Sequence, residues 1–390
     1  MNTQGCTLDR VRVARTDQEV EALRPYWTQL RFGHLDAQLD VFQSVVHTLP
    51  EALRPHVVVG ERDSTPVALL VARLEERELP ARFGYATVLR PRVRCLTVIS
   101  GGVAGPDGAE VPLVAELLAS LRRREADVVL FHRVTVGSSL HVQAVERPSR
   151  WARQRFLVPA RHWAMELPDS SDKLLPALPK KLRDNFKSRR RGLEREYGDR
   201  MEIRRIDAPE HAAEAIADLE AIAATTYQRG LGAGFSADRD GELAELGLRR
   251  GWFRAWILYL DGAPVAFELG TLHHDTFVVG AKGYDPSTTA RHVGWPVQLR
   301  MLEDLADDPE VRTVDFGFGD ADYKRRLATT GWDETDVLVY GRTARALVAN
   351  AGATAVLGAD RLARRLAGKE RIAKVKRRWR ALRTPAAAAS

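Results

Sequence analysis

The sequence predicts an α/β protein with two similar domains, each built on a mixed and largely antiparallel sheet, followed by a basic C-terminal helix. Its 390 residues exceed the length of a typical single domain. Strand-like apolar runs alternate with amphipathic helical patterns along the chain. The pattern Pro66-Val-Ala-Leu69 is similar to Ala263-Pro264-Val-Ala266, which is weak evidence for an internal repeat. We therefore expect domains at residues 1–167 and 168–345, and a basic helical tail at residues 346–390.

In the first half, the elements alternate between helix and strand. We expect a helix over Asp17–Leu30, a buried strand at Cys95–Ser100, a helix at Val111–Arg124 and a buried strand at Asp127–Arg133. The glycine-rich stretch Gly101–Gly105 is interpreted as a loop between strand and helix. No P-loop lysine follows it, which argues against a phosphate-binding loop.

The second half contains a longer series of strands. After a linker at Pro168–Pro179 we expect a hairpin in which Asp261-Gly262, a preferred two-residue turn, joins two apolar runs. His273 and His274 are interpreted as residues of the next turn. The remaining expected elements are a strand at Asp275–Tyr284, a helix at Arg291–Leu305, and strands at Val311–Phe318 and Asp336–Tyr340.

The composition describes an ordinary globular protein with an excess of positive charge. The chain has 28% charged and 45% hydrophobic residues, a net charge of +7 and a sequence pI of about 9.5. An anionic partner is consistent with this balance. Cys6 and Cys95 form neither a disulfide framework nor a metal-ligand pattern, so we expect a cytoplasmic protein without metal or tightly bound cofactor. We also expect no signal peptide and no membrane-spanning segment, because the amino terminus lacks an apolar core and no stretch approaches about 18 uninterrupted apolar residues.

Two basic helices are expected, at Lys180–Tyr197 and Thr343–Arg383. Each has two open interpretations, a solvated charged surface or a surface that contacts phosphates. For the second helix, an anionic membrane and the protein's own acidic face are further possible partners. The phosphate-binding interpretation of the first helix selects Lys180, Lys181, Arg183, Lys187 and Arg190 as donor-binding residues. For RNA binding by the second helix, the corresponding residues are Lys374, Lys376, Arg377, Arg378 and Arg380.

The strand at Val311–Phe318 ends in glycines and an acid, and it is followed closely by Lys324. The segment Asp315–Lys324 resembles the D-F-x-x-G-D-x-x-Y-K signature of GNAT-fold acyltransferases. The closest resemblance is to the cellulose-biosynthesis-accessory (CelD-like) family, over roughly residues 170–345. The chain is similar, more distantly, to Fem-type aminoacyl-tRNA-dependent transferases. The Fem-type resemblance also implies tandem GNAT domains.

The GNAT resemblance implies a donor pyrophosphate loop of the form R/Q-x-x-G-x-G/A before a helix. Arg291, His292 and Gly294 occupy this place, but the second small residue is replaced by Pro296, which has no N–H. A conventional coenzyme A site is therefore in doubt. Aminoacyl-tRNA is slightly favoured as co-substrate, and acyl-CoA remains the alternative.

Amide formation requires a deprotonated amine, a stabilised oxyanion and a proton for the leaving group. We expect Lys324 to stabilise the oxyanion or a substrate phosphate, and Asp320 or Glu268 to act as base. Tyr284 and Tyr340 are candidate proton donors for the leaving group, with core packing as the favoured interpretation of each, and Tyr284 is the one selected as a catalytic residue. The predicted function is N-acyl transfer to an amine on a small-molecule or cell-wall-type acceptor. A non-catalytic GNAT scaffold that binds nucleic acid or an anionic membrane is the remaining alternative, and the oligomeric state is left open.

Overall fold

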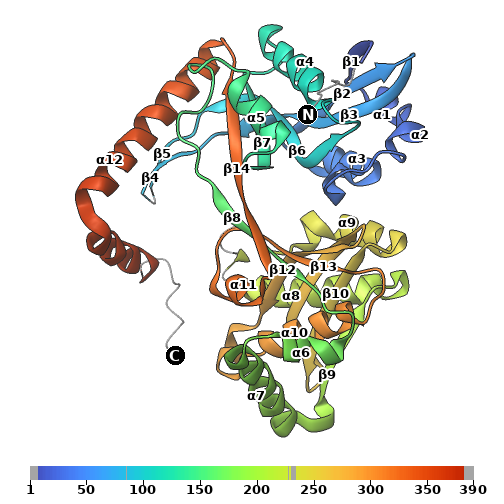
Figure 1. Ribbon diagram of the computed structural model, residues 1–390. Helices are drawn as coiled ribbons and strands as arrows, with labels where there is room; N and C mark the ends of the chain where they lie inside the picture. Colours follow the sequence, from blue (N-terminus) through green and yellow to red (C-terminus); the bar gives the residue numbers. More distant parts are fainter. Residues whose placement is uncertain (1–7, 85, 227, 230–233, 382–390) are drawn as a thin grey trace. The chain divides into compact units, whose positions relative to one another are not determined.

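The computed structural model describes residues 8–84, 86–226, 228–229 and 234–381, and the chain divides into two compact units (Figure 1). Unit 1 comprises the residues up to 31, residues 49–158 and the residues from 335 onward. Unit 2 comprises residues 32–48 and 159–334. Both units are therefore discontinuous in sequence, whereas the sequence predicted three consecutive segments.

Unit 1 is built on a sheet with the strand order β1-β2-β3-β6-β7, to which the later residues of β14 belong. The pairs β1–β2, β2–β3 and β3–β6 are antiparallel, whereas β6 and β7 are parallel. A separate hairpin consists of β4 and β5. The bounds are β1 Arg10–Ala14, β2 Ala52–Arg62, β3 Thr65–Glu78, β4 Ala81–Phe83, β5 Ala86–Leu89, β6 Arg92–Ala104, β7 Val128–Thr135 and β14 Thr330–Tyr340. The helices of unit 1 are α1 Asp17–Glu21, α2 Arg24–Trp27, α4 Glu110–Arg122, α5 Ser139–Glu146 and α12 Ala344–Ala381.

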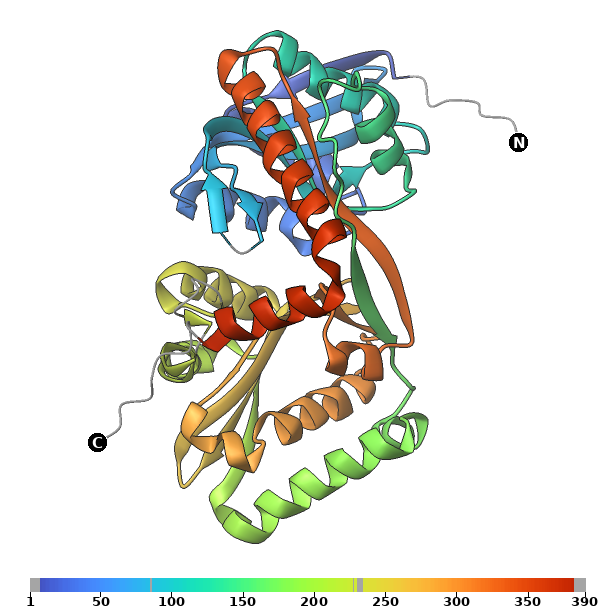
Figure 2. The same cartoon turned by 90° about the vertical axis from the view of Figure 1, so that its left-hand side faces the viewer.

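Helices cover both faces of the unit 1 sheet. On one face, Leu113 and Leu117 of α4 pack with Leu96 of β6. On the other face, Ala346 of α12 packs with Cys95 of β6. Successive strand residues point to opposite faces, so the odd and even positions of β6 contribute to two different cores. Figure 2 shows α12 beside the β4–β5 hairpin, where the Gly84 N–H donates to Asp360 Oδ1 at 2.8 Å.

Unit 2 repeats this arrangement with the strand order β9-β10-β11-β12-β13-β8, followed by the first residues of β14. Again one neighbouring pair, β12 with β13, is parallel. The strands are β8 Ala160–Glu166, β9 Met201–Ile206, β10 Phe253–Leu260, β11 Ala263–His273, β12 Thr276–Tyr284 and β13 Thr313–Phe318. The α-helices are α3 Leu39–Thr48, α6 Ser171–Ala177, α7 Lys180–Tyr197, α8 Ala212–Thr225, α9 Ala237–Arg250, α10 Gly294–Ala306 and α11 Asp322–Leu327. Short 3₁₀ turns lie at η1 Leu35–Ala37, η2 Gly198–Arg200, η3 Pro209–His211 and η5 Pro286–Arg291.

The unit 2 sheet is also covered on both faces. Trp256 and Leu258 of β10 belong to a core that includes residues of α6, α7 and α10. The alternate residues Ala255 and Ile257 belong to a second core with residues of α8 and α9. All eight residues of β10 are buried, as expected for a strand covered on both sides.

The parallel pair β12 and β13 separates after a short stretch of pairing. Only Thr276–Val278 pair with Thr313–Asp315. β12 nevertheless stays paired with β11 as far as Tyr284, which lies opposite Ala266. The later residues of β12 therefore have a ladder partner on one side only, and the strands open beside the amino-terminal end of α10.

The structure tests several local predictions directly. The helix at Lys180–Tyr197 is confirmed, and so is the Asp261-Gly262 turn, in which both residues have positive φ. The continuous linker at 168–179 is wrong, because it contains α6. The expected helix from Asp17 is also wrong in extent, because it divides into α1 and α2, the latter beginning with Pro25 in its first turn.

The glycine-rich stretch of unit 1 and the helix expected at Arg291–Leu305 also differ from their predictions. The predicted loop at Gly101–Gly105 is wrong for most of its length, because β6 continues to Ala104. α10 begins at Gly294 rather than Arg291, because η5 ends at Arg291 and His292 has a left-handed backbone. Among the described residues, no helix is both long enough and apolar enough to cross a bilayer.

Candidate functional site

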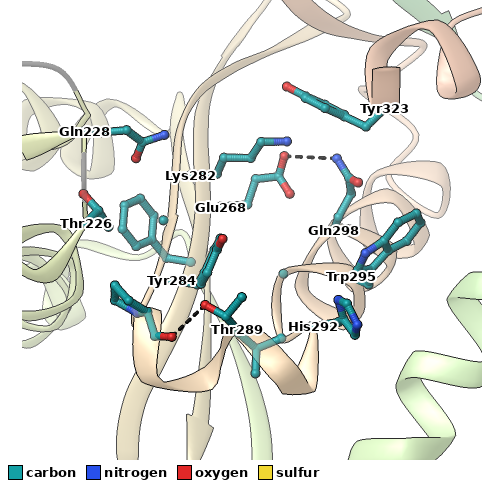
Figure 3. Close-up of a pocket in the computed structure, with 15 residues that line it drawn as sticks. Thr226, Gln228, Glu268, Lys282, Tyr284, Thr289, His292, Trp295, Gln298 and Tyr323 are labelled. Atoms are coloured by element: carbon teal, nitrogen blue, oxygen red, sulfur yellow. Dashed lines mark hydrogen bonds between the residues drawn. The ribbon is translucent and has the colours of Figure 1, made fainter. Parts of the chain in front are cut away.

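A pocket of about 520 Å³ lies in unit 2, where β12 and β13 separate (Figure 3). Its walls come from β11, β12, the start of α10, α11 and the segment after α8. It is lined by Thr226, Gln228, Phe267, Glu268, Lys282, Gly283, Tyr284, Pro286, Thr289, His292, Val293, Gly294, Trp295, Gln298 and Tyr323. The pocket thus combines an open strand edge with buried ionisable groups.

Glu268 and Lys282 are the central charged pair of this pocket. They lie directly opposite each other on β11 and β12. Glu268 is 2% exposed, and Gln298 Nε2 donates to its Oε1 at the long distance of 3.5 Å. Burial raises the pKa of Glu268, although the charge of Lys282 opposes this shift. Burial also lowers the pKa of Lys282, with Glu268 opposing.

Tyr323 covers this pair from α11. Lys282 Nζ lies 3.1 Å from the centroid of the Tyr323 ring, an arrangement in which the ring face attracts an ammonium group. Burial raises the pKa of Tyr323, and the charge of Glu268 adds to the effect. The phenol therefore remains protonated over the ordinary pH range.

The amino-terminal end of α10 forms another wall of the pocket. A Cβ built on Gly294 would meet nothing within 4 Å, so this wall is open. The Trp295 N–H donates to His292 O at 3.1 Å, and Pro296 carries no N–H. Fewer amides of the first turn are thus available to an anion than in an ordinary helix.

Four residues predicted from the sequence line this one pocket: Glu268, Tyr284, His292 and Gly294. Tyr284 is 43% exposed, and its side chain points into the drawn pocket (Figure 3). Arg291 is not among the lining residues, and its Nε lies 2.8 Å from Glu196 Oε1. The pairing with Glu196 raises the pKa of Arg291.

Lys324 and Asp320 lie outside the pocket lining. The ammonium group of Lys324 donates to Gly317 O and Phe318 O, both at 3.1 Å, and so braces the turn after β13. Asp320 is exposed and pairs with Arg325. Their catalytic roles stay predictions.

The basic residues of α7 are placed on its outer side. Arg190 pairs with Glu303 at 3.1 Å. Within the described residues, the four other selected residues form no ion pair: Lys180, Lys181, Arg183 and Lys187. The predicted RNA-binding set belongs to α12, but its side chains lie outside the described residues: Lys374, Lys376, Arg377, Arg378 and Arg380.

A second ionisable cluster surrounds His162 of β8. Its Nε2 lies 2.5 Å from Asp315 Oδ1, its Nδ1 lies 2.9 Å from Glu334 Oε2, and its ring stacks on Trp332 at 4.3 Å. Burial alone would lower the pKa of His162, but the two carboxylates outweigh this effect and raise the pKa to about 9. Asp315 also accepts the Gly317 N–H at 2.6 Å. The first acid of the sequence signature therefore orients its neighbours.

Sequence reasoning assigned no role to Lys282, Tyr323, Gln298 or His162. Tyr323 belongs to the quoted signature, which was a usable signal. His162 lies more than 150 residues from Asp315 and Glu334, its ion-pair partners, so no local pattern indicated that cluster.

Comparison with known proteins adds the family of this domain. Residues 180–325 match the family model described as an acetyltransferase (GNAT) domain. This match covers the pocket and the strands that form it, so unit 2 carries an acyltransferase domain of GNAT fold. The finer resemblance to the CelD-like family is not confirmed, and no curated protein sequence matches the chain significantly.

Solved structures agree on the fold. The crystal structure of FemX is similar with a TM-score of 0.56 and 10% identity, over 85% of this chain and 97% of that one. L-PGS from Bacillus licheniformis has a TM-score of 0.51 and 11% identity, over 84% and 95%. A conserved protein of unknown function from Bacteroides thetaiotaomicron has a TM-score of 0.52 and 12% identity, over 84% and 100%. At these identities the likeness concerns the fold alone, which the matches share over most of the chain.

Proposed function

We propose that unit 2 transfers an aminoacyl group from tRNA to an amine acceptor in the pocket beside β12. The observation that carries the proposal is Glu268, a buried carboxylate that faces the pocket with one long hydrogen bond from Gln298. A carboxylate with a raised pKa and few partners is suited to accept a proton near neutral pH.

In the proposed reaction, the acceptor enters as its neutral amine, and Glu268 takes the proton that the nitrogen loses as it bonds to the donor carbon. The amine nitrogen thus forms a bond to the carbonyl carbon of the donor, and the ester C–O bond to the ribose breaks. Tyr284 gives its phenolic proton to the leaving oxygen and recovers a proton from solvent, to which Glu268 releases its own. The positive charge of Lys282 opposes the effect of burial on Glu268 and so favours the ionised base.

The open edge of β12 supports binding of an extended substrate. Beyond Val278, β12 has no ladder partner on its β13 side within the described strands. Backbone N–H and C=O groups on such an edge pair readily with an extended chain. An aminoacyl group or a peptide-like acceptor has amide groups that match this edge.

The donor assignment rests on the amino-terminal end of α10 and on the basic residues of α7. The first turn of α10 has a proline and an occupied amide, which weakens a pyrophosphate site. The unpaired basic residues of α7 favour a larger polyanion such as tRNA. The Fem-type resemblance of the signature segment points the same way. We also propose a cytoplasmic location, because charged tRNA is available there.

The donor is tested with hydroxylamine as a surrogate amine acceptor. The purified protein is supplied with tRNA charged with a labelled amino acid mixture, and the aminoacyl hydroxamate formed above the enzyme-free rate is measured. We expect product with charged tRNA and none when the tRNA is treated with RNase beforehand. Product that persists after RNase treatment would contradict a tRNA donor.

An acyl-CoA donor is the second candidate, favoured by the acetyltransferase match and by the open space at Gly294. The same assay with acetyl-CoA distinguishes the two donors, because this reaction is insensitive to RNase. A non-catalytic scaffold would form no hydroxamate above background with either donor.

A further inference from the structure

A second pocket lies in unit 1, on residues that the proposed transferase site does not use. Its volume is about 620 Å³. It is lined by Val145, Arg150, Trp151, Arg153, Gln154, Arg155, Phe156, Leu157 and Val337. Three of these nine residues are arginines, and none is acidic.

The floor of this pocket is held by backbone pairing. Arg153 forms an antiparallel bridge with Val339 of β14. The Gln154 N–H donates to Leu338 O at 2.8 Å, and the Tyr340 N–H donates to Ala152 O at 2.5 Å. The segment therefore presents its side chains from a fixed backbone, which favours a preformed site.

The arginines of the pocket have no carboxylate partner within the described residues. Arg153 Nη1 donates to Val145 O at 2.6 Å, and Arg155 lies over the Trp151 ring. Elsewhere in unit 1, by contrast, Arg15 and Arg54 both pair with Glu125. Uncompensated guanidinium groups gathered in a concave site attract an anion, and their planar shape matches phosphate.

Aromatic rings lie beside these charges. Trp151 is 78% exposed, and Arg155 Cζ lies 5.2 Å from its ring centroid. Arg361 Cζ lies 4.3 Å from the centroid of Phe156. An exposed indole face next to guanidinium groups is a surface on which a nucleobase stacks.

Gln154 adds a polar group without a partner. Its Nε2 donates to Phe156 O at 2.8 Å, which fixes the orientation of the side-chain amide. Its Oε1 is buried and has no hydrogen-bond partner within the described residues. Because this oxygen has almost no accessible surface, Gln154 shapes the wall of the pocket and does not itself contact a ligand.

We propose that this pocket binds a nucleoside phosphate, either free or at the end of an RNA strand. The phosphate contacts Arg150 and Arg155, and the base stacks on Trp151. This proposal does not depend on the donor used by unit 2.

The test is isothermal titration of the full chain with ADP, with a short single-stranded RNA, and with inorganic phosphate. We expect saturable binding of ADP or RNA that is at least tenfold tighter than binding of inorganic phosphate. Trp151→Ala and Arg155→Ala are each expected to weaken binding about tenfold. Both side chains are exposed, so the variants are expected to fold. Arg147→Ala is the matched control, since Arg147 is exposed on the same segment but does not line the pocket.

The outcomes distinguish a free nucleotide from an RNA end, and binding in this pocket from binding in the pocket of unit 2. Tighter binding of ADP indicates a free nucleotide, and tighter binding of RNA indicates a strand end. Either supports the proposal, provided that Glu268→Gln leaves the affinity unchanged. Four results would overturn it. The first three are no saturable binding of ADP or RNA, equal binding of inorganic phosphate and ADP, and equal effects of Arg155→Ala and Arg147→Ala. The fourth is a loss of affinity in Glu268→Gln, which would place the ligand in the pocket of unit 2.

Discussion

In each unit, a glutamate is buried on the strand that lies next to the parallel pair in the sheet, which is β3 in unit 1 and β11 in unit 2. The two glutamates differ in the hydrogen bonds that they accept. In unit 1, Glu75 of β3 receives hydrogen bonds from Arg73 at 2.5 Å, Thr97 Oγ1 at 2.7 Å and Arg77 at 3.3 Å. In unit 2, Glu268 of β11 receives one bond from Gln298 at 3.5 Å and faces a pocket. Both side chains are 2% exposed.

We propose that this contrast separates a structural carboxylate from a reactive one. A buried carboxylate that is fully hydrogen-bonded is stabilised by its partners, and its oxygens are not available to take a proton from a substrate. A buried charge with one long hydrogen bond has unused acceptor capacity, which a substrate amine can occupy. The two units share a fold, but of these two glutamates, Glu268 is the one that faces a pocket beside separated strands.

The largest expected effect is the loss of transfer in Glu268→Gln. Removal of the base should lower the rate by about 100- to 10,000-fold in the hydroxamate assay. Asp320→Asn is the matched control, because Asp320 is the other predicted base and is exposed. A larger loss in Asp320→Asn than in Glu268→Gln would assign the base to the loop after β13 instead.

The same substitution, Glu268→Gln, also tests the comparison through the pH dependence of the free energy of unfolding. The folded pKa of Glu268 is raised, so this carboxyl ionises in the unfolded chain at a lower pH than in the fold, and stability is lost between these two pKa values. The wild type should therefore lose stability relative to the variant as the pH rises from about 4.5, the ordinary glutamate value. Chemical denaturation of both proteins across this range measures the difference.

The next effect concerns His162, the charged group of the second cluster in unit 2. Its folded pKa of about 9 lies above the ordinary 6.5, so its ion pairs stabilise the fold fully below pH 6.5. This contribution should decline as the pH rises from 6.5 to 9, by up to about 3 kcal/mol. Urea denaturation of the wild type and His162→Gln at several pH values should show the free-energy difference shrinking over this window.

His132→Gln is the control for His162. His132 pairs with Asp336 at 3.0 Å but is about one-third exposed, so solvent screens the pair. We expect its variant to change stability by less than about 1 kcal/mol at all these pH values. A difference for His162→Gln that stays constant between pH 6.5 and 9 would show that the imidazole is not charged in the fold.

Glu75→Gln tests the other side of the comparison. The amide cannot accept all the bonds that Arg73, Arg77 and Thr97 donate, so unit 1 should lose about 2 kcal/mol of stability. Hydroxamate formation should stay within about twofold of the wild type at a temperature where both are folded. A rate loss as large as that of Glu268→Gln would mean that the buried carboxylate of unit 1 also takes part in catalysis.

The sequence predicts the fold better than it predicts the site, and β11 shows why. The Asp261-Gly262 turn and the apolar alternation identified the hairpin, and the turn after His273 was also expected. From that turn, an uninterrupted register would place Glu268 opposite Ala281. A bulge between Leu269 and Gly270 shifts the register by one residue, so that Lys282 lies opposite Glu268 instead.

That bulge depends on a contact which the sequence does not reveal. A Cβ on Gly270 would lie 2.2 Å from Val278 O, so the close approach of the two strands requires glycine. A lone glycine in a strand pattern indicates that a bulge is present, but it does not show how the bulge shifts the pairing of the two strands. The pairing of Glu268 with Lys282 therefore follows from tertiary packing, whereas Glu268 itself could be selected as an acid within an apolar strand.

The smallest of these effects is expected for Lys282→Met, which keeps an unbranched side chain one atom shorter and removes its charge. The positive charge of Lys282 lowers the pKa of Glu268 against the effect of burial. Without it, the pKa of Glu268 rises further, and the acidic limb of the pH–rate profile should move to higher pH. Near neutral pH we expect a loss of about tenfold, equivalent to about 1.4 kcal/mol in the barrier.

Lys282→Arg separates the charge of this residue from its packing, because it keeps the cation beside Glu268 and over the Tyr323 ring. The acidic limb of the pH–rate profile of Lys282→Arg should stay close to that of the wild type, whereas the limb of Lys282→Met should move to higher pH. If both variants lower the rate equally at every pH, the limb has not moved, and Lys282 acts through contact with substrate rather than through the proton affinity of Glu268. The pH–rate profile therefore distinguishes a tuned base in unit 2 from a carboxylate that, like Glu75, is fixed by its partners.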